Sequence, residues 1–125
     1  MSSEQYFMAK LQYETDCADV YQAMLNNDDD FLLLDVRAPE AYQKSHAIKA
    51  VNFPSREIDE QSVTKLDKSK LIVVYCWGPG CNGATKAASK LSSLGFNVKE
   101  MIGGIQYWED FERYPVQRRV NEAQQ

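Results

Sequence analysis

The stretch from Leu71 to Leu94 reads L-I-V-V-Y-C-W-G-P-G-C-N-G-A-T-K-A-A-S-K-L-S-S-L, and it predicts a buried strand, a glycine-rich loop and a helix. Its first residues, up to Val74, are all apolar, which is typical of a strand in a parallel sheet that is covered on both faces. After the loop, apolar residues return at helical spacing at Ala84, Ala87, Ala88, Leu91 and Leu94, and Gly95 is placed to end the helix. Cys76 therefore lies where a central strand ends, which is the edge of an open α/β sheet where ligands bind.

The loop after this strand has a composition that favours an anion. Its glycines allow backbone N–H groups to point inward, and the helix that begins near Asn82 or Gly83 adds its own unpaired N–H groups. Because a thiolate is an anion, we expect the pKa of Cys76 to lie below the value of about 8.5 of a free cysteine, so that this residue acts as a nucleophile. The alternative is that Cys76 is only a small apolar filler. The remaining residues that we expect to form the binding loop are Trp77, Gly78, Gly80, Asn82 and Gly83.

A second cysteine, Cys81, lies five residues after the first in the same loop. If the two sulfurs meet, Cys81 can attack a persulfide or sulfenate on Cys76 and leave a disulfide; otherwise its side chain packs against the helix. Trp77 either forms an apolar wall beside the nucleophile or shields the loop from water. Two cysteines and one histidine supply no fourth ligand at suitable spacing, so we expect neither a zinc site nor another cofactor.

Length and composition predict one domain in a reducing compartment. The chain has 125 residues, 44% of them hydrophobic, which suffices for a single core. A net charge of -4 argues against a surface for nucleic acids or anionic membranes. The first residues resemble no leader segment, no apolar run approaches a membrane span, and three cysteines cannot all pair. We therefore expect a soluble, cytoplasmic protein.

Patterning predicts alternating helices and strands along the rest of the chain. Phe31 to Leu34 is a second uninterrupted apolar run and predicts another buried strand. The other expected elements are a helix within Ser2 to Tyr13, a helix capped by Thr15 or Asp16 that ends near Asn26, a helix from Pro39 to Lys44, a strand from Ala50 to Pro54, a helix around Asp59 to Leu66, a strand from Phe96 to Met101 and a helical turn after Gly103 and Gly104. The predicted fold class is α/β, with a mainly parallel central sheet and helices on both faces.

Four polar or reactive residues outside the loop are interpreted first as structural. Asp35 and Arg37 flank the end of the second buried strand, where a paired and buried charge that fixes the next loop is commoner than a catalytic group. His46 is the sole histidine, and we expect it to hold a loop by hydrogen bonds rather than to act as a base. Cys17 lies at helical spacing from apolar residues and is expected in the core.

Three stretches taken together resemble the rhodanese-like domains. They are Asp35-Val36-Arg37 with Glu40, Tyr42, His46 and Asn52-Phe53-Pro54, then Cys76 at its strand end, and Gly103-Gly104-Ile105-Gln106-Tyr107-Trp108. The resemblance covers residues 15–116 and leaves residues 1–14 as an N-terminal extension and residues 117–125 as a polar tail. It implies that Cys76 forms a persulfide, takes sulfane sulfur from a thiosulfate, polysulfide or persulfide donor, and passes it to a thiol or protein acceptor.

The loop departs from the pattern of that family. Family loops commonly carry a basic residue for the charge of the donor, whereas the first one here is Lys86, and the loop is about one residue longer than usual. The related phosphatases need an arginine where Asn82 stands, and without it phosphoryl transfer loses its main stabilising interaction. Two classes of function stay open: a sulfurtransferase that uses Cys76 and is resolved by Cys81, or a low-turnover module for binding, regulation or redox sensing.

Overall fold

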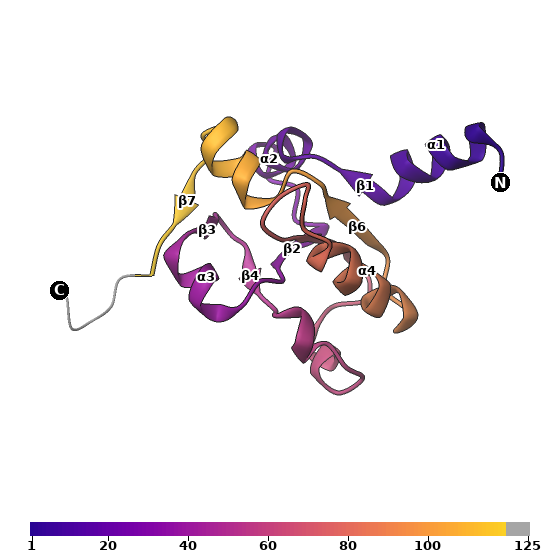
Figure 1. The fold of residues 1–125 in the computed structure, drawn as a ribbon. Coiled ribbons are helices and arrows are strands. Elements are labelled where there is room, and N and C mark those ends of the chain that lie inside the picture. Colours follow the sequence, from indigo (N-terminus) through magenta and orange to yellow (C-terminus); the bar gives the residue numbers. More distant parts are fainter. Residues whose placement is uncertain (120–125) are drawn as a thin grey trace.

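The structure is built on a parallel sheet of five strands (Figure 1). A computed structural model of the 125-residue chain describes residues 1–119. The strands of this sheet are β1 (Glu14–Thr15), β2 (Phe31–Asp35), β4 (Val51–Asn52), β5 (Leu71–Tyr75) and β6 (Val98–Met101). Their order is β1-β6-β5-β2-β4, and every neighbouring pair is parallel. The predicted mainly parallel sheet is therefore confirmed, with the apolar strand β5 at its centre.

Strand β5 lies at the centre because neither of its faces can meet water. Ile72 and Val74 are fully buried on one face, and Val73 and Tyr75 are buried on the other. The neighbouring strand β2 pairs with β5 along its whole length, so that equivalent side chains of the two strands stack in rows. Alternate residues of one apolar run thus supply two separate cores, as expected for a sheet that is covered twice.

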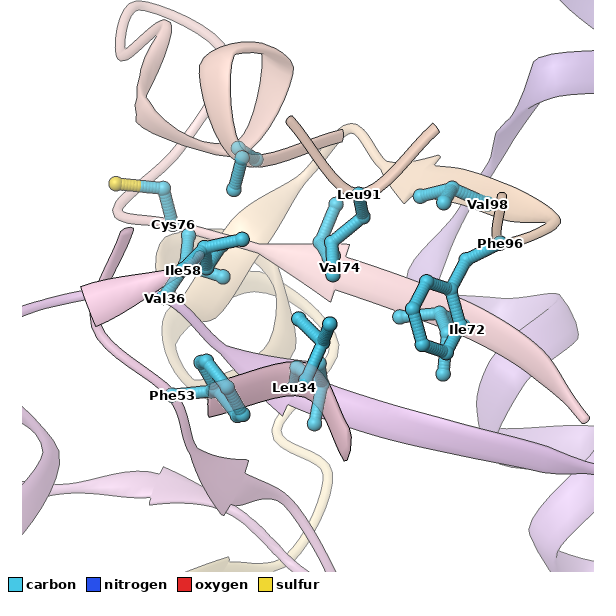
Figure 2. Packing of buried hydrophobic residues seen from close by; sticks show 13 residues of the cluster. Leu34, Val36, Phe53, Ile58, Ile72, Val74, Cys76, Leu91, Phe96 and Val98 are labelled. Carbon is cyan, nitrogen blue, oxygen red and sulfur yellow. The ribbon is translucent and has the colours of Figure 1, made fainter. Parts of the chain in front are cut away.

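Helices cover both faces of the sheet, as the sequence predicted. On one face, α4 (Gly83–Ser93) buries Ala84, Ala87 and Leu91 against β5, and the short helices η1 (Ser55–Glu57) and η2 (Ser62–Lys65) lie beside it. Figure 2 shows this core, with Cys76 at its edge and the cysteine sulfur directed away from the aliphatic side chains. On the other face lie α2 (Cys17–Leu25) and the π-type helix η3 (Gln106–Phe111), which buries Trp108 completely.

Some elements are shorter than the sequence predicted. Helix α3 (Pro39–Lys44) has its expected bounds, but the helix expected around Asp59 to Leu66 is reduced to η2. The side chain of Asp59 accepts the N–H groups of Gln61 and Ser62 and holds a turn that competes with a regular helix. The strand expected from Ala50 to Pro54 is reduced to β4, which pairs with only the last two residues of β2.

The two ends of the described chain are a helix that projects from the domain and a short paired strand. The N-terminal helix α1 (Ser3–Tyr13) begins with a capping box between Ser2 and Gln5, buries none of its side chains, and projects from the domain (Figure 1). At the other end, β7 (Val116–Gln117) pairs antiparallel with β3 (His46–Ala47). Gln117, the first residue of the expected polar tail, is therefore paired, and residues 120–125 of that tail lie outside the described residues. Within residues 1–119, none of the helices combines the length and the apolar character needed to cross a bilayer.

The end of α4 yields a test of the backbone geometry. Gly95 follows this helix with a φ of +94°, a conformation that L side chains rarely adopt. We expect Gly95→Ala to lower the free energy of unfolding by about 1–2 kcal/mol, measured by urea denaturation. Ser92→Ala is the matched control, because Ser92 is exposed on the same helical turn, and it should change the stability by less than about 0.5 kcal/mol. Equal stabilities of the two variants would contradict this explanation.

Candidate active site

The candidate site lies at the carboxyl end of β5 and is held in place by a distant segment. The backbone carbonyl groups of Cys76 and Trp77 accept hydrogen bonds from the N–H groups of Ile105 and Gln106, at 3.0 and 2.9 Å. Gly104 precedes these donors with a φ of +63°, and a Cβ added there would lie 2.7 Å from the carbonyl oxygen of Cys76. Because only glycine fits this close approach, the Gly-Gly segment near the C-terminus fixes the start of the cysteine loop.

The structure brings the two cysteines of the loop together. The Sγ atoms of Cys76 and Cys81 are 2.9 Å apart, and both residues are free thiols. Cys76 is buried, with 8% of its surface exposed, whereas Cys81 is half-buried and nearer to solvent. Gly83 lies against the pair, since a Cβ added there would be 2.8 Å from the sulfur of Cys76. Of the two orientations that the sequence left open for Cys81, the structure has the one in which the sulfurs meet.

The expected low pKa of Cys76 is wrong for this structure. Burial, together with the hydrogen bond to Cys81, raises the pKa of Cys76 to about 12. The pKa of Cys81 is lowered instead, because Cys76 donates a hydrogen bond to it and the N–H groups of Gly83 and Trp77 also stabilise its thiolate. The start of α4, at Gly83, therefore lowers the pKa of Cys81 rather than that of Cys76. The first thiolate of the pair forms on Cys81.

Both cysteines line a pocket of about 600 Å³. The predicted loop residues Gly78, Gly80 and Asn82 line it as well. The sequence analysis did not identify the other wall, which includes Glu14, Asp16, Cys17, Glu100, Tyr107 and Glu112. Glu14 and Glu100 meet because β1 pairs with β6 in the register that sets these residues opposite each other. No local pattern in the sequence signals that pairing.

The third cysteine borders the same pocket from α2. Cys17 is buried in the core, as expected, with 4% of its surface exposed. Its Sγ lies 3.6 Å from the carbonyl oxygen of Gly104, to which the thiol donates a hydrogen bond. Burial raises the pKa of Cys17 to about 12, so this residue is a neutral thiol in the wall of the pocket.

Trp77 does not line the pocket, so it forms no wall beside the cysteines. Its ring is 52% exposed and lies over the guanidinium group of Arg37, with 4.5 Å between Cζ and the ring centroid. This is the distance of a cation–π contact. Trp77 therefore covers the ion pair at the end of β2 and leaves the mouth of the pocket open to other groups.

Asp35 and Arg37 form a buried ion pair outside the pocket. The Nη2 atom of Arg37 lies 2.8 Å from Oδ2 of Asp35, and the two residues are 4% and 0% exposed. Arg37 also donates from Nη2 to the carbonyl oxygen of Ser45, at 2.6 Å, and from its backbone N–H to Asp35. These bonds tie the end of β2 to the segment after α3, which is the bracing arrangement expected from the sequence.

His46 lies in β3, apart from the cysteine pocket. Its Nδ1 atom is 2.7 Å from the carbonyl oxygen of Tyr42, and its ring stacks on that of Tyr42 with 3.6 Å between centroids. These contacts connect α3 to the start of β3. Among residues 1–119, no three histidine, cysteine or acidic side chains form a group that could hold a metal ion.

Comparison with known proteins identifies the family. The model of the rhodanese-like domain matches residues 18–111, a range that contains the ion pair, the cysteine loop and the Gly-Gly segment. The chain belongs to the rhodanese-like domain family. The resemblance predicted from the three stretches of sequence is thus confirmed.

Several rhodanese-like relatives show how far the similarity extends. Thiosulfate sulfurtransferase PspE from Escherichia coli K12 is 37% identical over 73 residues, which span 58% of this chain and 68% of that protein. The crystal structure of the BH2092 protein from Bacillus halodurans has a TM-score of 0.89 and 44% identity, over 94% of this chain and 85% of that one. A probable molybdopterin-synthase adenylyltransferase from Porphyra purpurea is 28% identical over 96 residues, and the match spans only 25% of its length.

The buried ion pair predicts a large effect on stability. Asp35→Ala leaves the guanidinium of Arg37 buried without its partner, so we expect the free energy of unfolding to fall by about 3–5 kcal/mol. Chemical denaturation measures this change. The control is Asp29→Ala in the exposed turn before β2, which should alter the stability by less than about 0.5 kcal/mol. A stable Asp35→Ala variant would show that the pair does not brace this part of the fold.

The packing of Gly83 predicts an effect on the cysteine pair. In Gly83→Ala the new methyl group would lie 2.8 Å from Sγ of Cys76, so this side chain must rotate away from Cys81. We expect disulfide formation with a mild oxidant to slow about tenfold or more. The rate is measured as the loss of free thiols over time. Gly80→Ala is the matched control, because no atom lies within 4 Å of its added Cβ. If both variants oxidise at the wild-type rate, contact between the sulfurs does not depend on Gly83.

Proposed function

We propose that this domain is a sulfurtransferase that carries sulfane sulfur as a persulfide on Cys76. One observation carries the proposal: Cys76 ends the central strand at a pocket of about 600 Å³, with a second thiol 2.9 Å from its sulfur. Membership of the rhodanese-like family supports it, as does similarity to a protein named thiosulfate sulfurtransferase. The substrates are a sulfur donor, which is a polysulfide, persulfide or thiosulfate, and a thiol or protein acceptor.

In the proposed loading step, Cys81 acts as the base for Cys76. The two sulfurs are 2.9 Å apart and the pKa of Cys81 is the one that is lowered, so the proton of the Cys76 thiol passes to Cys81 as Cys76 attacks. Cys76 bonds to the sulfane sulfur of the donor and the S–S bond of the donor breaks. The rest of the donor leaves as a thiolate from a polysulfide or persulfide, and as sulfite from thiosulfate. A high pKa of Cys76 is compatible with this step because the proton acceptor is already in contact.

The persulfide then has two routes of discharge. An external thiolate can attack the outer sulfur, which gives a new persulfide on the acceptor and returns Cys76 to its starting form. Alternatively, Cys81 releases to solvent the proton that it took up during loading, and its thiolate then attacks Sγ of Cys76. A Cys76–Cys81 disulfide forms, and the outer sulfur leaves as hydrosulfide. The second route requires a thiol reductant to restore the two cysteines before another cycle.

The same pair of cysteines supports a second candidate function, which is a redox-sensing or regulatory module with low turnover. The two sulfurs are within 2.9 Å, and an oxidant that removes two electrons and two protons would join them directly. For either function we propose a reducing compartment such as the cytoplasm, because all three cysteines are free. We propose no nucleic-acid or membrane partner, since the net charge of -4 disfavours polyanionic surfaces.

Mass spectrometry after treatment with polysulfide tests the carrier and the resolving residue. We expect wild type to gain one sulfur atom on Cys76 and then to release sulfide and form the loop disulfide without added thiol. Cys76→Ser should neither gain sulfur in the loop nor transfer it to cyanide. Cys81→Ser should load more slowly at neutral pH, because the base is absent, and should hold the persulfide longer.

Each variant controls for the other, since each keeps one thiol of the pair. Full sulfur transfer by Cys76→Ser would overturn the role of Cys76 as carrier. A wild-type persulfide lifetime in Cys81→Ser would overturn the resolving role of Cys81. If wild type forms only the disulfide and never transfers sulfur to an acceptor, the redox-sensing function is the correct one.

A further inference from the structure

The walls of the cysteine pocket are acidic. Glu14, Asp16, Glu100 and Glu112 line it, and the described residues that line it include no lysine, arginine or histidine. Glu14 and Asp16 lie in one stretch, from β1 to the N-cap of α2, whereas Glu100 comes from β6 and Glu112 follows η3, so the carboxylates belong to three separate segments. The cysteine pair defines the reactive site, and the carboxylates set the charge of the space through which a substrate must reach it.

Nearby lysines only partly compensate this charge. Lys10 forms an ion pair with Glu14 at 2.8 Å, and Lys86 is near enough to help lower the pKa of Cys81. The remaining contacts of the carboxylates are hydrogen bonds: Asp16 accepts from the N–H of Asp19, and Glu100 accepts from the hydroxyl of Thr85. Such bonds leave the carboxylate charge in place. With the two lysines counted against the four carboxylates, the pocket stays net negative.

The charge of the pocket opposes the usual anionic sulfur donors. Thiosulfate carries two negative charges, and the carboxylates that line the pocket repel it. A cationic carrier would instead be attracted, and complementary charge of this kind raises association rates by about tenfold or more.

We infer that the pocket selects sulfur carriers with a positive charge close to the reacting sulfur, such as an aminothiol or a cysteine flanked by basic residues. This inference rests on the proposed sulfur transfer at Cys76 and names the substrate class of the same site. A small aminothiol and a protein cysteine flanked by basic residues share one chemistry, which is a thiol or persulfide beside an ammonium or guanidinium group. The carboxylates of the pocket are then specificity-determining residues, since they act on the charge of the carrier and not on the bond that breaks.

Labelling of the cysteines tests the charge preference without any sulfur transfer. The probes are two methanethiosulfonates, one with a trimethylammonium group and one with a sulfonate group. The rate at which each probe labels the protein is divided by the rate at which it reacts with free 2-mercaptoethanol. The ratio of the two normalised rates, cationic over anionic, measures the charge preference. We expect wild type to react at least about tenfold faster with the cationic probe, and added salt should reduce this ratio. In the double variant Glu100→Gln, Glu112→Gln the ratio should fall severalfold.

Glu60→Gln is the control for net charge, because Glu60 is exposed and lies outside the lining of the pocket. It should keep the wild-type ratio. Equal normalised rates for the two probes in wild type would overturn the inference. So would a ratio that falls as far in Glu60→Gln as in the double variant, since the preference would then reflect the charge of the whole protein.

Transfer from loaded protein tests the same preference in the proposed reaction. The acceptors are cysteamine, 2-mercaptoethanol and 3-mercaptopropionate, with each rate corrected for the fraction of thiolate. The expected order is cysteamine first and 3-mercaptopropionate last. A lysine-flanked cysteine peptide that reacts faster than cysteamine assigns the site to protein carriers, and the reverse assigns it to small aminothiols. Transfer without charge preference overturns this inference alone, whereas selective labelling without transfer overturns the proposed sulfurtransferase function alone.

Discussion

The burial of β5 on both faces determines where chemistry can occur in this domain. A strand that contributes Ile72 and Val74 to one core and Val73 to the other has no position for a reactive or charged side chain until it ends. Its last residue, Tyr75, is fully buried, and its hydroxyl accepts a hydrogen bond from the N–H of Ala47. Reactive groups can therefore gather only past the carboxyl end of the strand, where Cys76 begins the loop.

The cysteine loop keeps its shape because two other parts of the chain hold its ends. The segment after β6 donates backbone hydrogen bonds to Cys76 and Trp77, and a Cβ added at Gly78 would lie 2.5 Å from Oε1 of Gln106. Helix α4 begins at Gly83, which lies against the sulfur of Cys76. A loop that is fixed at both ends needs little reorganisation when its sulfurs exchange partners, which favours a reaction at this point.

The sequence predicted those features that depend on local pattern. The two buried strands, α3 and α4 follow from apolar spacing and from residues such as Pro39 and Gly95 that begin or end helices. The acidic wall could not be predicted, because Glu14 and Glu100 become neighbours only through the register of two distant strands. The pKa of Cys76 was misjudged for a related reason. The glycine-rich loop and helix terminus were visible in the sequence, but the depth of burial and the position of the Cys81 sulfur were not.

The departures of this loop from its family have a common physical interpretation. A buried thiol with a raised pKa attacks poorly by itself, and a basic side chain that could stabilise its thiolate is missing from the pocket. Cys81 offers a different solution, because a thiolate in contact with the Cys76 thiol can accept its proton as the new S–S bond forms. Under the proposed mechanism, the second cysteine of the loop changes how Cys76 is activated, and the carboxylates of the pocket change which carriers can approach it.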